Sequence, residues 1–280
     1  MKIIRSIFEL TKQLIKLREH PISIGFIPTM GALHNGHISL VEEAKKKTQF
    51  VICSIFVNPT QFNNKEDLAL YPQTEKEDLK LLADNKCDLV FIPCHTDIYD
   101  SDYHFPFLDL GSLGSVMEGE FRPGHFHGVC QVVYRFFDII KPSQAFFGLK
   151  DFQQVSIIRF MTNHFNIPVE IIACETKRNG KGLALSSRNL LLSITEQENA
   201  LFLFKSLELA KTLAMTSNPL EVKKQVISYI NSSPLRLEYV EIINPEDLST
   251  LSHHWVPKTR ICIVAYSGTI RLIDNMEITD

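Results

Sequence analysis

Two histidines beside a glycine mark the stretch best suited to chemistry, residues 25–40, which reads GFIPTMGALHNGHISL. An apolar run ends near Thr29, and an amphipathic run that predicts a helix starts at about Ile38. His34 and His37 therefore lie near a helix start, where partial positive charge and unpaired N–H groups attract anions, above all phosphate. Glycine lets the backbone approach a ligand, and imidazole can hydrogen-bond to charge that develops on phosphorus. This combination is typical of a nucleotide phosphate site.

A metal site or a pair of surface histidines would use the same two side chains. Two histidines three residues apart can share a metal ion, but a zinc site needs further ligands, and no Cys or His cluster nearby supplies them. The strand, the proline turn and the glycines around His34 and His37 favour the phosphate site instead.

A second candidate group, Lys150, Asp151 and Gln154, follows the short apolar run AFFG. Lys150 could neutralise a phosphate there, and Gln154 could offer its amide to a substrate. A plain helix start, with Asp151 as the cap and Lys150 in solvent, explains the same residues. Taken alone, the group favours the plain helix start.

Two hydroxyls and a guanidinium stand side by side at Ser186, Ser187 and Arg188. Such a set can donate hydrogen bonds to phosphate, and a loop between two domains can close over a bound nucleotide. A turn followed by a helix cap accounts for the same residues equally well.

Neutral amides follow the second apolar run at Asn58 and Gln61, in the stretch FVNPTQF. They suit recognition of hydroxyl and carboxylate groups, although Asn-Pro is also a common turn start. The glycine-rich residues 118–128, which include Arg122 and His125, could form a mobile flap over a site. An ordinary surface loop is the interpretation that this stretch favours.

Length and composition limit the possible functions. The chain has 280 residues, 45% of them apolar, which is enough for one large or two ordinary domains. A net charge of -3 argues against nucleic-acid and membrane-surface partners. The six cysteines form no C-x-x-C pair, which indicates a reducing cytoplasm, and no apolar run approaches the roughly 20 residues of a membrane helix. The sequence has no P-loop and no G-x-G-x-x-G fingerprint.

Apolar runs alternate with helical patterns through residues 1–175. We expect strands at 22–27, 51–57, 89–92, 145–147 and 169–173. We expect helices at 1–20, 38–47, 129–140 and 152–165, with a broken helical segment at 67–85. This alternation predicts an α/β fold with a doubly wound, Rossmann-like parallel sheet, whose ligands bind beyond the carboxyl ends of the strands.

A glycine-containing basic loop near Glu175 suggests a domain boundary, with a first domain at residues 1–175 and a second at 176–280. In the second we expect helices at 195–214 and 219–230 and strands at 237–243, 260–266 and 269–273. The second domain is therefore predicted to be smaller and α+β.

Seven stretches, in this order, resemble the pantoate-beta-alanine ligase family of HIGH-motif nucleotidyltransferases: PTMGALHNGH, SIFVNPTQF, DLALYP, RPGHFHGV, FFGLKDFQQ, GLALSSRN and RLIDN. The resemblance runs from end to end. It implies that ATP and (R)-pantoate form pantoyl adenylate and pyrophosphate, after which β-alanine attacks to give pantothenate and AMP. It also implies Mg²⁺ with the ATP and a homodimer formed through the larger domain, and it leaves the metal ligands unassigned.

The resemblance assigns roles by position. The residues implied to hold ATP are Met30, Gly31, Ala32, Leu33, His34, Asn35, Gly36, His37, Gly148, Leu149, Lys150, Asp151, Lys177, Leu185, Ser186, Ser187 and Arg188. Those implied to be catalytic are His34, His37, Lys150, Ser186, Ser187 and Arg188, with His37 as a proton donor in family terms. Gln61 and Gln154 are implied to hold pantoate, with Asn58 beside them. On physical grounds, we expect both histidines to stabilise charge on the transferring phosphoryl group.

The chain departs from the family pattern at Leu149, where Glu is usual, and at Lys181, where Asp is usual. The first change removes a carboxylate from the expected ATP loop, and the second reverses a charge beside the closing loop. An alternative function is a nucleotidylyltransferase that stops at an adenylated product, because it would share the histidine motif. A nucleotide-sensing or RNA-binding module would require a basic patch, which the charge balance does not indicate.

Overall fold

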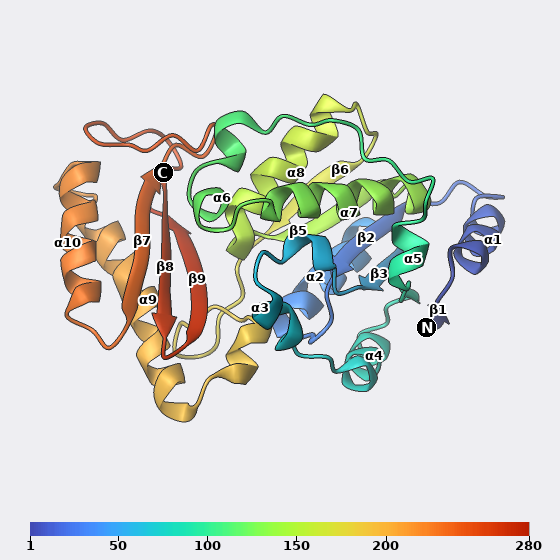
Figure 1. Ribbon diagram of the computed structural model, residues 1–280, viewed down its shortest axis with the longest axis horizontal. Helices are drawn as coiled ribbons and strands as arrows, with labels where there is room; N and C mark the ends of the chain where they lie inside the picture. Colours follow the sequence, from blue (N-terminus) through green and yellow to red (C-terminus); the bar gives the residue numbers. More distant parts are fainter. Residues whose placement is uncertain (280) are drawn as a thin grey trace.

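Two sheets lie at opposite ends of the molecule in a computed structural model, which describes residues 1–279 (Figure 1). The larger sheet has six strands in the order β1-β4-β3-β2-β5-β6, and every neighbouring pair is parallel. Its strands are β1 (Lys2–Ile4), β2 (Ile24–Thr29), β3 (Phe50–Ile55), β4 (Leu89–Phe91), β5 (Gln144–Gly148) and β6 (Glu170–Cys174). The predicted doubly wound parallel sheet is therefore confirmed.

Helices cover both faces of this sheet. One face packs against α1 (Ile7–Leu17), α7 (His125–Ile140) and α8 (Phe152–His164), and the other against α2 (Asn35–Lys47) and α4 (Glu75–Asp84). Successive strand residues point to opposite faces, so Phe26 belongs to the first of these cores and Ile27 to the second. Burial on both faces explains why the strands read as continuous apolar runs.

The order of the strands fixes where a ligand can bind. Strands β3 and β4 continue the sheet on one side of β2, whereas β5 and β6 continue it on the other. The topological switch point therefore lies between β2 and β5, which end at Thr29 and Gly148. Short helical turns lie in the same half of the chain: η1 (Pro59–Gln61), α3 (Lys65–Ala69), α5 (His95–Ile98), η2 (Gly111–Gly114), α6 (Glu118–Phe121) and η3 (Leu149–Asp151).

The smaller sheet is antiparallel, in the order β7-β8-β9. The elements of this part are η4 (Ser187–Leu191), α9 (Ile194–Leu213), α10 (Pro219–Asn231), β7 (Arg236–Ile243), β8 (Arg260–Ser267) and β9 (Ile270–Glu277). Helices α9 and α10 build a core on one face with residues such as Leu203, Val226 and Ile263. The other face places Tyr239 and Val264 against Phe152, at the start of α8. The α+β arrangement predicted for this part is confirmed.

The start of the chain differs from its prediction. Residues 2–4 pair with β4 as an edge strand, and α1 begins only at Ile7, after a Ser6 cap. A strand of three residues is too short to show a period of its own, so it could not be told from the helical pattern that follows.

The prediction of a surface loop at 118–128 is wrong. This stretch forms α6, a turn at Gly124 and the first turn of α7. Glu118 and His125 are both buried. Pro123 and Gly124 do mark a turn, but contacts with distant parts of the chain bury the residues on either side of it.

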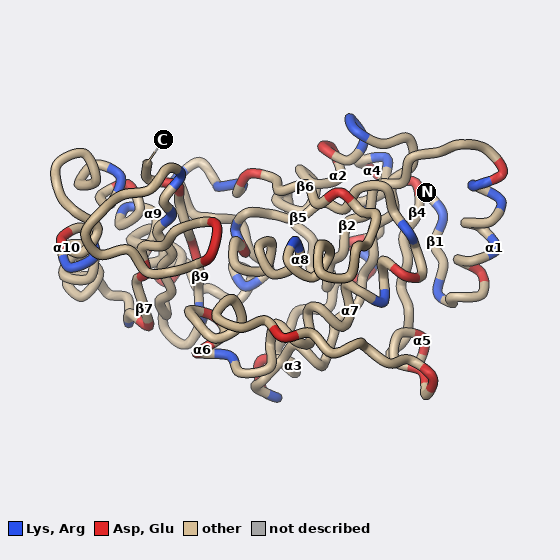
Figure 2. Tube along the Cα trace, turned by 90° about the horizontal axis from the view of Figure 1, so that it is seen from above, with Lys and Arg blue, Asp and Glu red and all other residues tan. Residues whose placement is uncertain are grey.

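The surface carries charge of both signs. Figure 2 shows Lys and Arg positions interspersed with Asp and Glu positions along the whole trace. Within residues 1–279, none of the helices combines the length and the apolar character needed to span a bilayer.

Candidate active site

A cavity opens at the carboxyl edge of the parallel sheet, at the switch point between β2 and β5. Segments far apart in the sequence meet there. Predicted site residues that line it are Met30, His34, Gly36, His37, Gln61, Gly148, Lys150, Asp151, Gln154, Lys177, Leu185, Ser186, Ser187 and Arg188. The structure thus brings together the histidine motif, the lysine group, the Ser-Ser-Arg group and the two glutamines.

The two histidines cap the helix that carries them. His34 is the N-cap of α2, and its Nδ1 accepts a hydrogen bond from the N–H of Gly36 at 3.1 Å. The Nδ1 of His37 accepts in turn from the N–H of His34 at 3.3 Å. Because a backbone N–H can only donate, both rings must carry their proton on Nε2 when neutral. The capping box therefore selects the tautomer that presents Nε2–H as a donor.

Gly36 is required for this arrangement. A Cβ at this position would lie 2.7 Å from Cε1 and 2.8 Å from Nδ1 of His34, which is closer than such atoms approach. The ring centroids of His34 and His37 are only 4.1 Å apart, so the His34 ring has little room to retreat. The glycine between the histidines thus permits close packing of one ring against the helix start.

Both imidazoles are neutral at physiological pH. Burial, together with the positive charge of Lys150, lowers the pKa of His34 to about 4. Burial lowers the pKa of His37 to about 3, with further contributions from His34 and Lys150. The pair therefore offers two neutral N–H donors at the start of a helix rather than two positive charges.

Lys150 and Asp151 lie in η3, between the end of β5 and the start of α8. The Nζ of Lys150 is 3.7 Å from a carboxylate oxygen of Asp151. Asp151 occupies the N-cap position of α8 but makes no capping hydrogen bond with its side chain. The plain helix-start interpretation therefore accounts for the place of Asp151, but not for Lys150, whose side chain is only 17% exposed and lines the cavity.

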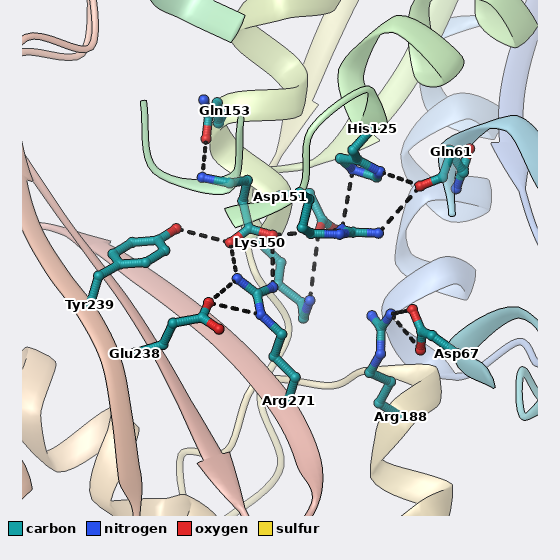
Figure 3. Close-up of polar contacts among 12 residues, drawn as sticks. Gln61, Asp67, His125, Lys150, Asp151, Gln153, Arg188, Glu238, Tyr239 and Arg271 are labelled. Carbon is teal, nitrogen blue, oxygen red and sulfur yellow. Dashed lines mark hydrogen bonds and ion pairs between the residues drawn. The ribbon is translucent and has the colours of Figure 1, made fainter. Parts of the chain in front are cut away.

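The Ser-Ser-Arg group, residues 186–188, forms another part of the cavity wall. Ser186 caps η4 by accepting from the N–H of Arg188 at 3.3 Å, as the alternative interpretation of this group expects. The hydroxyl of Ser187 donates to the carbonyl of Ala32 at 2.9 Å and so ties this wall to the histidine loop. Arg188 donates to both carboxylate oxygens of Asp67 at 2.9 and 3.2 Å (Figure 3). The guanidinium is thus held in place beside the cavity.

Gln61 is positioned by residues from α7 and the turn before it. The Nδ1–H of His125 donates to the carbonyl of Gln61 at 2.7 Å (Figure 3). A guanidinium nitrogen of Arg122 lies 3.2 Å from the Nε2 of the same ring. Burial, followed by the charge of Arg122, lowers the pKa of His125 to about 4, so this ring is neutral as well. Arg122 and His125 both line the cavity.

Asn58 hydrogen-bonds to the side chain of Gln61 and does not line the cavity. It is 1% exposed, and its amide donates to the Gly128 carbonyl at 3.0 Å and to the side-chain oxygen of Gln61 at 3.3 Å. Its own oxygen accepts from Tyr99 at 2.7 Å. The turn interpretation of Asn58 therefore describes its contacts better than direct binding does.

Five of the predicted ATP residues do not line the cavity, namely Gly31, Ala32, Leu33, Asn35 and Leu149. The N–H groups of Ala32 and Leu33 donate to the buried carboxylate of Asp78 at 2.9 and 2.7 Å. Ala32 has a φ of 51°, so this carboxylate holds a strained backbone in place. The histidine loop is therefore fixed from α4.

Neither departure from the family pattern lies on the cavity wall. Leu149 packs against the apolar cluster around Tyr239 and Val264. Lys181 is exposed, and its N–H donates to the side chain of Asn179 at 3.0 Å within a turn.

Several wall residues were outside the predicted set. They are Pro28, Thr29, Leu40, Phe62, Tyr71, Arg122, His125, Phe146, Phe147, Glu175 and Thr176. The apolar ones carry no chemical pattern in the sequence. The sequence did offer a flap over a site as one interpretation of the stretch that contains Arg122 and His125. Its glycine-rich composition favoured a surface loop instead.

Comparison with known proteins identifies the family of the chain. A family model described as pantoate-beta-alanine ligase matches residues 2–277. A pantothenate synthetase of Azobacteroides pseudotrichonymphae is 45% identical over 280 residues, 99% of each chain. The crystal structure of a Thermus thermophilus pantothenate synthetase superposes with a TM-score of 0.94 at 36% identity, with full coverage of both chains. A Francisella tularensis pantoate-beta-alanine ligase, complexed with beta-gamma ATP and beta-alanine, gives a TM-score of 0.80 at 37% identity, covering 99% and 97% of the two chains.

Proposed function

The chain belongs to the pantoate-beta-alanine ligase family, and we propose that the cavity between β2 and β5 is the site where it works. The protein uses ATP to condense (R)-pantoate with β-alanine, giving pantothenate, AMP and pyrophosphate. One observation carries the assignment of the cavity. Two neutral imidazoles, with their protons on Nε2, stand at a helix start in the same cavity as Lys150 and Arg188.

The first half-reaction calls for charge stabilisation. A carboxylate oxygen of pantoate attacks the α-phosphorus of ATP, and the bond from that phosphorus to the pyrophosphate oxygen breaks. Nucleophile and leaving group are both anions, so no proton has to be transferred. Donors aimed at the phosphoryl oxygens are what such a step requires. His34, His37, Lys150 and Arg188 supply them in our proposal, supported by their place on the cavity wall.

The pKa of His37 bears on its family role as a proton donor. With a pKa of about 3, the imidazolium is scarce at physiological pH. We propose that His37 donates a hydrogen bond through Nε2–H, which needs no protonated ring. Ser186 and Ser187 then hold the wall in place through Arg188 and Ala32, and they can turn their hydroxyls to a phosphate when ATP binds.

The second half-reaction needs the two substrates to be side by side. The neutral amine of β-alanine attacks the acyl carbon of pantoyl adenylate, the bond to the AMP oxygen breaks, and the proton that the nitrogen loses passes to water. Gln61 and Gln154 line the cavity with neutral amides, which can hold the hydroxyls of pantoate in either half-reaction. The network of His125 and Asn58 fixes Gln61 for this purpose.

ATP enters as its Mg²⁺ complex in our proposal. The ion arrives with the substrate, because phosphate oxygens and water supply most of the ligands that Mg²⁺ prefers. Asp151 and Glu175 line the cavity and offer further carboxylate oxygens. Removal of Mg²⁺ with a chelator is expected to abolish adenylate formation, while the unfolding transition stays unchanged.

The two sheets take separate parts in this proposal. Residues 1–175 form the nucleotide- and pantoate-binding domain, and residues 176–280 form a smaller domain that closes over ATP. The separate core around α9, α10 and β8 supports this division, as does the wall that Leu185 to Arg188 contribute to the cavity. The carbonyl of Lys177 accepts from the N–H of Leu185 at 2.9 Å, which links the two ends of the intervening loop.

We further propose a cytoplasmic homodimer formed through the larger domain. Five of the six cysteines are buried as free thiols, which suits a reducing compartment. Ile3, Phe8 and Ile15 leave apolar surface exposed on β1 and α1, within the larger domain. Light scattering from the purified chain tests the dimer, since a monomeric mass at micromolar concentration would contradict it.

Exchange of labelled pyrophosphate into ATP tests the adenylation half of the proposal. We expect exchange that depends on pantoate and on Mg²⁺ and does not need β-alanine. The Arg188→Ala variant is expected to lose it while keeping the wild-type unfolding transition, because Arg188 is half-buried at the cavity edge. Exchange at the wild-type rate in this variant would show that Arg188 takes no part in adenylate formation.

A further inference from the structure

The stretch RLIDN, residues 271–275 of β9, resembles the family but has no part in the reaction described above. It lies in the antiparallel sheet, yet three of its side chains reach out of that sheet. Arg271 binds Glu118 of α6 at 2.8 Å, and Asp274 pairs with Arg178 at 2.9 Å. Asn275 reaches η3, the turn that carries Lys150.

Asn275 makes the contact closest to the chemistry. Its side-chain amide donates to the carbonyl of Leu149 at 2.9 Å and to the carbonyl of Lys150 at 2.8 Å. Both protons of one NH₂ group are therefore used on two consecutive carbonyls, which fixes the direction of the backbone at this turn. The residue is 5% exposed, so water does not replace these contacts readily.

The orientation of the Asn275 amide is itself fixed. Its oxygen accepts from Arg260 at 2.7 Å, so the NH₂ group must face η3 rather than Arg260. The guanidinium of Arg260 also lies over the Phe152 ring, 4.6 Å from its centroid, at the start of α8. The amide is thus held between Arg260 of β8 and the turn of η3. In a flipped amide, the NH₂ group would face the donor Arg260 and the oxygen would face the two carbonyl oxygens.

We propose that Asn275 is a positioning residue for Lys150. By holding the carbonyls of Leu149 and Lys150, it sets the direction in which the lysine side chain leaves the backbone and enters the cavity. The contact crosses between the two sheets, so correct placement of Lys150 requires the smaller sheet to be docked. Because Lys150 acts on ATP in the proposed function, this role of Asn275 rests on that function.

A double-mutant cycle separates positioning from general stability. Pantoate-dependent pyrophosphate release is measured for the wild type, Asn275→Ala, Lys150→Ala and the double variant. We expect Asn275→Ala to lower kcat by about 10- to 100-fold, as small misplacements of a reacting group do, with the pantoate KM changed by less than about twofold. In the Lys150→Ala background, Asn275→Ala is expected to add less than about a twofold loss. Equal losses in both backgrounds, or an unchanged kcat, would overturn the proposal.

Two further variants control for folding. Asn275→Asp retains the volume and the Arg260 contact but replaces the donors, and it takes the place of Asn275→Ala if that variant does not fold. Asn218→Ala removes the N-cap of α10 in the same half of the molecule, away from the cavity. Asn218→Ala is expected to lower the stability of this half of the molecule without affecting Lys150. Its kcat is therefore expected to stay at the wild-type value. A loss of kcat in Asn218→Ala like that of Asn275→Ala would overturn the positioning role.

ATP affinity distinguishes failure of this proposal from failure of the proposed function. If the wild-type chain releases no pyrophosphate with pantoate, the proposed function is wrong, and titration calorimetry with Mg²⁺ and ATP still tests the link. Asn275→Ala is then expected to weaken ATP binding when Lys150 is present and to leave it unchanged in Lys150→Ala. Weakening by the same factor in both backgrounds would contradict the link.

Discussion

The backbone N–H of His34 donates to the Nδ1 of His37 at 3.3 Å, so the second histidine of the motif completes the helix cap that the first begins. This contact, together with that of Gly36 with His34, places the proton of each ring on Nε2. The same hydrogen bonds that start α2 therefore prepare its histidines as neutral donors. Structure and chemistry at this site have a common origin in the capping box.

His37→Asn separates the two tasks of this side chain. The Asn oxygen takes roughly the place of Nδ1 and can still accept from His34, but nothing replaces Nε2–H. We expect adenylate formation to fall by about 10²-fold or more, as when one donor is removed from a charge-stabilising site. Melting temperature should stay near the wild-type value, whereas His37→Ala should lose stability as well. Wild-type pyrophosphate release in His37→Asn would show that Nε2–H is not used.

The low pKa values of the histidines predict a pH-dependent stability. The pKa values of His34 and His125 are about 4 and that of His37 about 3, against roughly 6.5 in an unfolded chain. Above about pH 6.5 neither state binds these protons, and between about pH 6.5 and about pH 4 the unfolded state binds them while the folded state does not. The free energy of unfolding should therefore fall as pH drops from about 7 to about 5. Urea midpoints measure this loss, and it should be smaller in His34→Gln, whose own titration is removed.

The buried ion pair between Glu118 and Arg271 predicts a large loss of stability on truncation. Burial alone would raise the pKa of Glu118, but the hydrogen bonds and charge of Arg271 lower it to about 2. Arg271→Ala leaves the carboxylate buried without its main partner, at a cost of about 3–5 kcal/mol. The stabilisation by this pair is complete above the ordinary carboxyl pKa and is lost as pH falls toward about 2. Denaturant unfolding should find the double variant with Glu118→Gln more stable than Arg271→Ala alone, and the reverse order would contradict this account.

Gly128→Ala tests how Gln61 is held. A Cβ on Gly128 would lie 2.3 Å from the Thr60 carbonyl oxygen and 2.7 Å from the N of Gln61, so η1 would have to move. We expect a loss of about 1–3 kcal/mol from overpacking and a clear rise in the pantoate KM. Gly180→Ala is the matched control, because its Cβ would meet nothing within 4 Å. An unchanged pantoate KM in Gly128→Ala would show that the position of Gln61 does not affect pantoate binding.

The parallel sheet could be predicted because both of its faces are buried. Strands such as β3 are therefore unbroken apolar runs, whereas a helix with one solvent-facing side would include polar residues over the same length. Once the strands are parallel, residues that follow β2 and β5 must meet at one edge, which is why His37 and Lys150 could be placed together. Strand β1 could not be predicted, because three residues carry no period.

Arg122 and His125 show where sequence patterns stop being informative. Their positions depend on contacts of His125 with Gln61 and of Arg122 with Glu118, and Gln61 lies 64 residues before His125. Local composition, rich in Gly and Pro, describes only the turn between α6 and α7. Asn58 illustrates a different limit, because the same amide could bind a ligand or stabilise a turn. Its exposure of 1%, which the sequence does not reveal, favours the turn.

The β-alanine dependence of product formation distinguishes a ligase from an enzyme that only adenylates pantoate. The purified chain receives ATP, Mg²⁺ and pantoate, and AMP and pantothenate are measured as β-alanine is added. We predict that the two products appear together in equal amounts, and that His37→Asn forms neither at an appreciable rate. Pyrophosphate release that depends on pantoate, with no amide product at any β-alanine concentration, would contradict the account and leave only an adenylating enzyme.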